Sequence, residues 1–230
     1  MKPAVARAGV LVWDLPARVC HWGFALSVSG SLVIGFRFDP RDDTFKYHMV
    51  LGLLALWFLA IRIVLGFCGG AQSRWRACVH PPRRIARYFA DVVRWRTEEP
   101  DGLNPGTAVF APAVYLALVA VIVTGFDADW VGSWHGWLSW GVIGLIAAHL
   151  LGLTLHALRH RRLSPLAMVH GRALRREGVA PAPARIAHGV ALAALSGLIV
   201  WLLLNHYDPN TSVLNLPFLP EISLPLIQKG

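Results

Sequence analysis

His135 and His149 are separated by fourteen residues within one long apolar stretch of the chain. On a helix, fourteen residues advance about 21 Å and return to within about 40° of the starting face. Both imidazoles would then lie on one side of that helix, separated by roughly two-thirds of the hydrocarbon thickness of a bilayer. Histidine is costly at membrane depth and usually faces a bundle interior there, with a function attached. The spacing therefore predicts two stacked haems, provided that other helices supply two more histidines at matching depths.

The apolar residues fall in runs that are too long for the buried core helices of a soluble protein. Hydrophobic residues make up 55% of the 230 residues and charged residues only 15%. We predict an all-α integral membrane protein, because no hydrophilic segment is long enough to form a separate soluble domain. Five runs approach the ~20 residues needed to span a bilayer: Val19–Phe36, Met49–Phe67, Ala108–Phe126, Trp137–Leu158 and Ile186–Leu204.

The net charge of +9 comes mainly from arginines that lie between these runs. In a soluble protein such a charge would suggest nucleic acid, but here the arginines gather between spans two and three and between spans four and five. The positive-inside rule therefore predicts a cytoplasmic N-terminus and, after five spans, a periplasmic C-terminus. Within the first Arg-rich loop, Ile85–Trp95 has the apolar spacing of a helix that lies on the inner membrane surface.

The N-terminal segment shows no convincing cleavage site, so we interpret the first run as a retained membrane span. Cys20, Cys68 and Cys78 all fall near the cytoplasmic side, where a structural disulfide is not expected. No Cys-x-x-Cys-His motif occurs in the sequence. Any haem is therefore expected to be bound without that covalent linkage.

The predicted topology sorts four histidines into two depths. His21 falls at the cytoplasmic start of span one, and His149 lies near the cytoplasmic side of span four. His48 and His135 fall at the outer starts of spans two and four. A single histidine of this kind is more often a structural residue at the interface, but four that match in depth on three helices favour haem ligation. Two axial imidazoles leave no open position on the iron and suit electron transfer.

The sequence resembles the prokaryotic cytochrome b561 family, which is related to the cytochrome b subunits of hydrogenases and formate dehydrogenases. The resemblance covers roughly Val10 to Met168, and it implies a four-helix bundle that holds two non-covalent b-type haems. It also implies His21 with His149 and His48 with His135 as the iron ligands, which agrees with the pairing by depth. The matching positions are Val12-Trp13-Asp14-Leu15-Pro16-Ala17-Arg18, His21-Trp22, His48 with Gly52, Arg62 with Leu65-Gly66-Phe67, Asn104-Pro105-Gly106-Thr107, and the His135/His149 pair.

Three residues leave alternatives open. Arg62 lies fourteen residues after His48, near the level of the inner haem, where it could bind a haem propionate or extend to the cytoplasmic headgroups. Quinol-reactive members of the family carry His-Asn-Pro before span three, whereas this chain has Leu103-Asn104-Pro105. Asn104 could bind a quinone carbonyl or cap the helix. His156, two turns beyond His149, is an alternative inner ligand.

The remaining histidines receive simpler interpretations. His188 and His206 flank span five and are expected to anchor it at the interfaces. Three others lie in basic cytoplasmic segments and are expected to be solvated: His80, His160 and His170.

We expect residues 1–168 to form a dihaem four-helix membrane domain. Residues 169–204 then form a cytoplasmic linker and a fifth transmembrane helix, and 205–230 form a periplasmic tail. The tail is too apolar for a free solvated end and too rich in proline for a further span. It is therefore expected to be ordered against another subunit.

The predicted function is that of a dihaem b-type cytochrome in a bacterial inner membrane. It would carry electrons between the quinone pool and a periplasmic c-type cytochrome or oxidoreductase subunit, and would act as an electron-transfer subunit rather than a stand-alone enzyme. One alternative is a haem-containing membrane anchor subunit for a periplasmic enzyme. Another is a haem-free transporter that uses the histidines as a proton relay.

The depth assignment makes a direct prediction for His149. The variant His149→Ala should lose the inner haem and keep the outer one, because only the inner iron would lose an axial ligand. A pyridine haemochrome count on the purified variant measures this loss. Retention of two haems per chain would refute the pairing.

Overall fold

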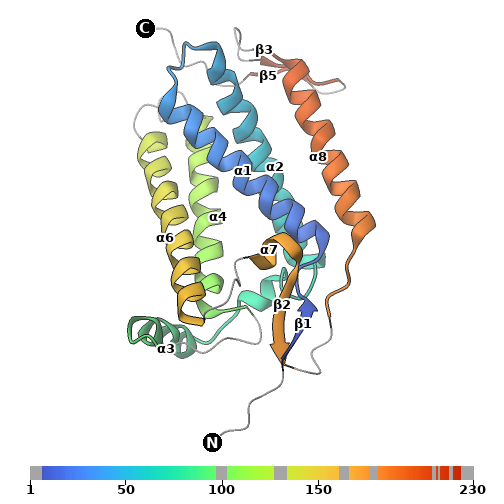
Figure 1. Cartoon of the computed structure of the whole chain (residues 1–230). Coiled ribbons are helices and arrows are strands. Elements are labelled where there is room, and N and C mark those ends of the chain that lie inside the picture. Colours follow the sequence, from blue (N-terminus) through green and yellow to red (C-terminus); the bar gives the residue numbers. More distant parts are fainter. Residues whose placement is uncertain are drawn as a thin grey trace, which may run out of the picture. The chain divides into compact units, whose positions relative to one another are not determined.

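Five long helices dominate the computed structural model, which describes residues 7–96, 103–126, 134–160, 166–176, 181–208, 211, 213–217 and 220–223 (Figure 1). Each helix is long and apolar enough to cross a membrane. Their ends fall within four residues of the predicted spans, so all five spans are confirmed. The helices are α1 (Leu15–Arg37), α2 (Lys46–Cys68), α4 (Pro105–Gly125), α6 (Gly136–His160) and α8 (Ile186–His206).

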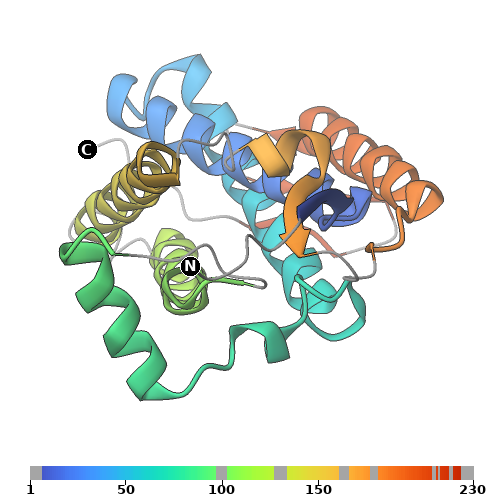
Figure 2. The same cartoon turned by 60° about the horizontal axis from the view of Figure 1, so that its bottom comes forward.

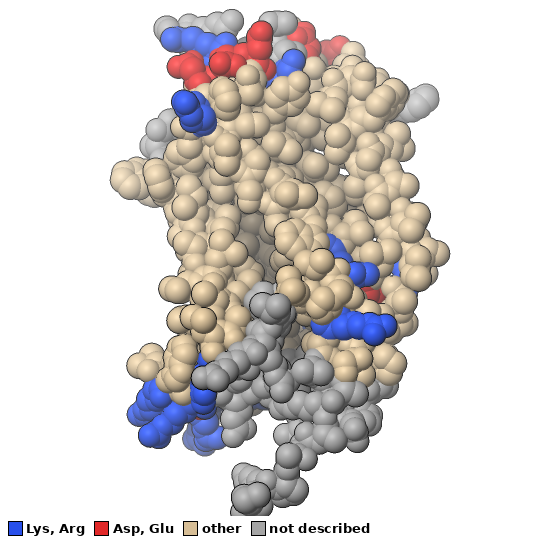
Figure 3. All heavy atoms as spheres, in the orientation of Figure 1, with Lys and Arg blue, Asp and Glu red and all other residues tan. Residues whose placement is uncertain are grey.

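The helices present large apolar side chains on their outer faces. Leu26, Phe67 and Leu116 are 68%, 75% and 71% exposed. In Figure 3 the long helices show wide surfaces without charge, and charged side chains gather in the connection between α1 and α2. A soluble monomer rarely leaves such continuous apolar surface in water, so lipid is the environment that these helices fit.

The chain divides into two compact units, which we describe separately. Unit 1 comprises Met1–Val19, Arg62–Val114 and Leu145–Val190. Unit 2 comprises Cys20–Ile61, Tyr115–Gly144 and Ala191–Gly230. The boundaries fall within the long helices, so each of these helices contributes one segment to each unit.

Unit 1 contains a two-stranded antiparallel sheet that the sequence did not predict. Strand β1 (Arg7–Leu11) pairs with β2 (Arg172–Arg176). A short helix, α7 (Ala167–His170), precedes β2 and ends at Gly171, whose positive φ of 79° suits a glycine. The Gly171 carbonyl accepts the N–H groups of Val12 and Trp13. These partners are far apart in the sequence, so no local pattern could reveal the pairing.

Asp14 joins three helix ends within unit 1. It is only 2% exposed, and its Oδ1 accepts the Ala17 N–H at 3.1 Å, which caps the start of α1. Its Oδ2 lies 3.8 Å from Nη1 of Arg185, which also donates to the Cys68 carbonyl at 3.0 Å. Arg185 has a φ of 48°, an unfavourable conformation for a residue with a side chain. These contacts hold Arg185 in place at the start of α8.

Helix α3 (Pro82–Val93) confirms the predicted amphipathic segment of unit 1. Pro82 occupies the first turn, where its missing N–H costs nothing. The helix ends two residues before the predicted limit because Trp95 adopts a positive φ of 56°. It runs crosswise to the unit 1 segments of α4 and α6 (Figures 1 and 2), as expected for a helix on a membrane surface.

In unit 2 the tail folds against the chain's own helices. Strands β3 (Tyr207–Asp208), β4 (Val213–Leu214) and β5 (Ile222–Ser223) form an antiparallel sheet in that order. Leu214 is buried with Val50 of α2 and Leu203 of α8. Apolar residues of the tail thus have an intramolecular role, while contact with another subunit and the three-part division of the chain stay predictions.

Replacing Asp14 with alanine should destabilise the protein by at least about 1 kcal/mol, a typical loss for an N-cap, because Arg185 also loses its carboxylate. Thermal unfolding in detergent measures the effect. Asp42→Ala is the matched control, since Asp42 also accepts a backbone N–H, from Thr44 at 2.7 Å, but in an exposed loop. Equal changes in the two variants would show that the contact with Arg185 does not stabilise the fold.

Candidate functional site

Unit 2 brings the imidazole rings of His48 and His135 close together. His48 is the third residue of α2 and follows the short 3-10 helix η1 (Asp43–Phe45). His135 lies in a π-helical turn immediately before α6, a local distortion that often occurs at functional sites. The two ring centroids are 6.0 Å apart and the ring planes meet at 80°. These are the two residues that the sequence assigned to the outer level.

Backbone carbonyls fix the orientation of both imidazoles. Nδ1 of His48 lies 2.8 Å from the carbonyl oxygen of Ser31 in α1. Nδ1 of His135 lies 3.0 Å from the carbonyl oxygen of Val121 in α4. A carbonyl can only accept, so each Nδ1 carries the proton and donates it. Each Nε2 therefore keeps its lone pair, as required of a metal ligand.

Both histidines line a mostly apolar pocket whose walls come from α1, α2, α4 and α6. Its cavity volume is about 130 Å³. Val28, Leu53 and Ile122 are among the apolar lining residues. A large flat apolar cofactor with two axial positions fits such a lining better than a hydrated ion does.

The separation of the two rings suits a shared metal ion. A coordinating imidazole nitrogen lies about 2 Å from its ion and the ring centre about 1 Å farther, so two imidazoles on opposite sides have centroids about 6 Å apart. Among the described residues, no group of three or more His, Cys, Asp or Glu side chains could hold a bare ion. A haem needs only two protein ligands because its porphyrin supplies four, so these residues fit a haem.

The two predicted inner ligands lie in different units. His149 belongs to unit 1, where its ring stacks on Phe110 at 5.2 Å with an interplanar angle of 16°. His21 belongs to unit 2 and meets the ring of Trp22 edge-on at 5.5 Å. The pairing of His21 with His149, and the alternative ligand His156, therefore stay predictions.

Arg62 contacts the loop that follows α2. The sequence had predicted a haem propionate or the cytoplasmic headgroups as its partner, and neither prediction included this loop. Its Nη1 donates to the Ser73 carbonyl at 3.0 Å, and its guanidinium lies over the Trp75 ring at 5.1 Å. Cys78 is close enough for the Arg62 charge to lower the pKa of its thiol, although burial has the larger effect and raises that pKa. Arg62 thus ties this loop to α2, and its binding to a propionate stays a prediction.

Asn104 caps α4, one of the two predicted alternatives. Its Oδ1 accepts the Thr107 N–H at 2.7 Å, and Pro105 occupies the first helical position. A Cβ placed on Gly106 would lie 3.2 Å from this oxygen and 3.3 Å from the Tyr88 hydroxyl, so both groups adjoin Gly106.

An imidazole also reaches the start of α4. Nε2 of His80 donates to the Leu103 carbonyl at 3.2 Å, which makes the expected solvated role wrong for this histidine. The tertiary structure therefore brings an imidazole beside Leu103, where the sequence lacks the histidine of the His-Asn-Pro pattern.

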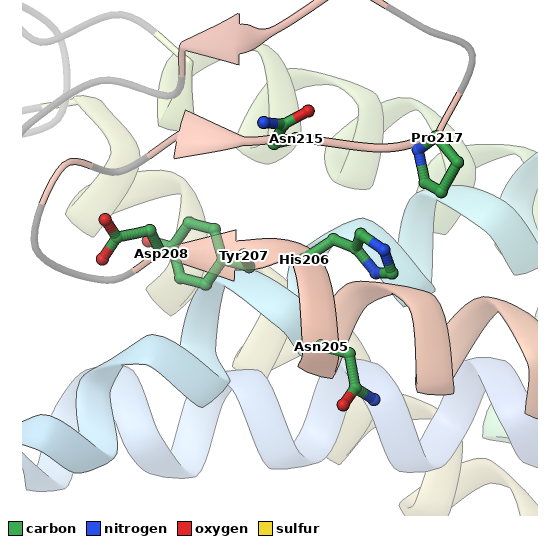
Figure 4. A pocket seen from close by; sticks show the side chains of 6 residues that line it. All are labelled: Asn205, His206, Tyr207, Asp208, Asn215 and Pro217. Atoms are coloured by element: carbon green, nitrogen blue, oxygen red, sulfur yellow. The ribbon is translucent and has the colours of Figure 1, made fainter.

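A second, more open pocket lies where α8 meets the tail of unit 2 (Figure 4). Its polar groups are engaged locally: Asn205 donates to the Trp201 carbonyl, His206 to the Leu202 carbonyl, and Asp208 accepts from Thr211. Figure 4 shows the labelled side chains pointing in different directions. Among the described residues, its lining consists of Asn205, His206, Tyr207, Asp208, Asn215 and Pro217.

Five apolar helices and a histidine pair in an apolar pocket fit a haem-binding membrane protein. The family model for prokaryotic cytochrome b561 matches residues 12–171, and the chain belongs to that family. The chain is 28% identical over 168 residues, 59% of its length and 67% of the relative's, to a probable Ni/Fe-hydrogenase B-type cytochrome subunit from Bradyrhizobium diazoefficiens. No solved structure matches the chain. The protein is a membrane b-type cytochrome that acts in electron transfer.

The His48–His135 pair predicts how single substitutions change the haem content. His48→Ala and His135→Ala should each remove one haem per chain, because each leaves an iron with a single axial imidazole. The matched control is His206→Ala, since His206 also donates from Nδ1 to a helix carbonyl but lies outside this pocket. Haemochrome counts that do not differ between the control and the two variants would show that the pair is not a ligand set.

Proposed function

We propose that this protein is a dihaem b-type cytochrome that carries electrons across a bacterial inner membrane, between the quinone pool and a periplasmic redox partner. The observation that supports it most is the His48–His135 pair, with its 6.0 Å ring separation and its two Nδ1 bonds to carbonyls. A bis-imidazole haem supplies reversible one-electron chemistry without an open position for oxygen. The protein residues supply ligation, orientation and an apolar surround.

The second haem of the proposal is assigned to His21 and His149. Helix α6 starts one residue after His135 and includes His149, so this helix would serve both haems. Phe110 stacks on the His149 ring and restrains its orientation. Two haems at two depths would divide the membrane crossing into short electron-transfer steps.

The proposed topology places the N-terminus and the Arg-rich loops in the cytoplasm and the tail in the periplasm. Helix α3 supports this orientation, because its arginines and its crosswise course suit an anionic inner surface. The named relative is a cytochrome subunit of a hydrogenase. We infer that the periplasmic partner of this chain is likewise an oxidoreductase subunit or a c-type cytochrome.

Quinone is proposed to bind at the start of α4. The cap uses Oδ1 of Asn104, and the Nδ2 protons of the same side chain can donate to a quinone carbonyl. The Tyr88 hydroxyl is a second donor, because a phenol is protonated at neutral pH. Burial raises the pKa of this phenol further. His80 adds an imidazole nitrogen that can exchange a proton.

Substitutions at this site should slow electron entry without loss of haem. We expect His80→Ala and Tyr88→Phe to lower the rate of haem reduction by quinol at least tenfold, because proton transfer by a positioned group contributes about 10²-fold or more. Stopped-flow spectroscopy measures this rate, and reduction by dithionite should be unchanged. His170→Ala is the control, since this exposed imidazole only accepts from the Arg172 N–H. Quinol reduction at the control rate in both variants would place the quinone elsewhere.

Two other functions have different outcomes in the same purified protein. Haems that quinol cannot reduce and no periplasmic partner oxidises would favour a haem-containing anchor for a periplasmic enzyme. A purified chain without a b-type spectrum would favour a haem-free proton relay and would contradict the main proposal.

A further inference from the structure

His48 and His135 contact their neighbouring helices in the same way. The His48 ring rests on α1, with Nδ1 at the Ser31 carbonyl, and Gly35 lies four residues after Ser31. The His135 ring rests on α4, with Nδ1 at the Val121 carbonyl, and Gly125 lies four residues after Val121. The pattern is therefore repeated: a carbonyl at one position and a glycine one helical turn later.

Both glycines lie next to the Nδ1–Cε1 edge of the rings. A Cβ placed on Gly35 would be 2.9 Å from both Cε1 and Nδ1 of His48. A Cβ placed on Gly125 would be 3.1 and 3.2 Å from the same two atoms of His135. The first distance is impossible and the second is tight, so a methyl group would have to push each ring away from its carbonyl.

Helix geometry explains why a glycine is needed at this spacing. Side chains on an α-helix tilt toward its N-terminus, so a Cβ stands over the carbonyl of the residue four positions earlier. That carbonyl also accepts its own helical N–H, and the Val121 carbonyl accepts the Thr124 hydroxyl at 3.0 Å as well. Glycine leaves the approach to this carbonyl open. Other glycines of the membrane helices, such as Gly141 and Gly144, have no side chain near them, so the contact with an imidazole distinguishes Gly35 and Gly125.

We propose that Gly35 and Gly125 are positioning residues for the iron ligands. Each exposes a helix carbonyl that takes the Nδ1 proton of one imidazole and thereby presents Nε2 to the metal. This inference rests on the proposed ligation by His48 and His135. The two Nδ1–carbonyl hydrogen bonds also hold the ring planes at 80° to each other. The angle between two imidazole ligands affects the magnetic properties of a ferric haem.

The test uses full-length protein with Gly35→Ala or Gly125→Ala. The controls are Gly141→Ala and Gly144→Ala in α6, where an added Cβ meets nothing within 4 Å. We expect affinity for the outer haem, from haemin titration of protein made in haem-deficient cells, to fall about 10- to 100-fold, the usual effect of losing the partner of a ligating histidine. Both controls should bind like the unmodified protein.

A spectroscopic readout separates positioning from general damage. Low-spin ferric haems with perpendicular and parallel axial imidazoles differ in EPR g anisotropy, so a displaced ring should shift the outer-haem signal and leave the inner one unchanged. Gly125→Ala is the milder substitution, because its contacts are 3.1 and 3.2 Å, and it should fold with the shifted signal. A folded Gly125→Ala protein with unchanged signal and affinity would overturn the proposal.

Three more variants show which part of the proposal has failed if the expected result is not seen. Ser31→Ala removes a hydroxyl 3.1 Å from Nδ1 of His48 but keeps the carbonyl, so its effect should be smaller than that of Gly35→Ala. An equal effect would assign the orientation of His48 to the hydroxyl and would contradict our inference there. If His48→Ala and His135→Ala retain the outer haem, the ligand assignment itself fails. If they lose it while both glycine variants behave like the controls, only the positioning role fails.

Discussion

The hydrogen bond from each outer imidazole Nδ1 to a helix carbonyl is the interaction on which the proposed centre depends. An imidazole can ligate iron only through a nitrogen that carries no proton. The carbonyls of Ser31 and Val121 decide which nitrogen that is, because they accept a proton and cannot donate one. Helices α1 and α4 therefore contribute to the centre through their backbones, while α2 and the turn before α6 contribute His48 and His135.

Helix α2, which carries His48, is held in place by contacts with α8 and the tail. Leu53 lines the pocket and also packs against the buried cluster formed by Val50, Leu203 and Leu214. Trp57, one turn farther along α2, donates to the Ser196 hydroxyl of α8 at 3.0 Å. The family match ends at residue 171, before α8 begins. Helix α8 and the tail of this chain thus pack against α2, the helix that carries His48.

The sequence alone was enough to predict the elements that depend on residues close together in the chain. The five spans and α3 follow from runs and periodicities of apolar residues. The Asn104 cap was one of two alternatives, and the hydrogen bond to Thr107 now shows it. The β1–β2 pairing, the contact of His80 with Leu103 and the loop around Arg62 join distant segments. No pattern in a single sequence records such contacts, because their partners are chosen by packing.

The sequence by itself determined the helices, because runs of apolar residues are read along the chain. It also predicted the depths of the four histidines from the helical rise per residue. Tertiary structure alone decided how the rings of His48 and His135 are oriented. Gly35 and Gly125 could be read from the sequence only as weak points in apolar helices. Their role became visible when a second helix brought an imidazole within 3.2 Å of where each Cβ would stand. Orientation depends on the approach of a neighbouring helix, and that distance is set by packing in three dimensions.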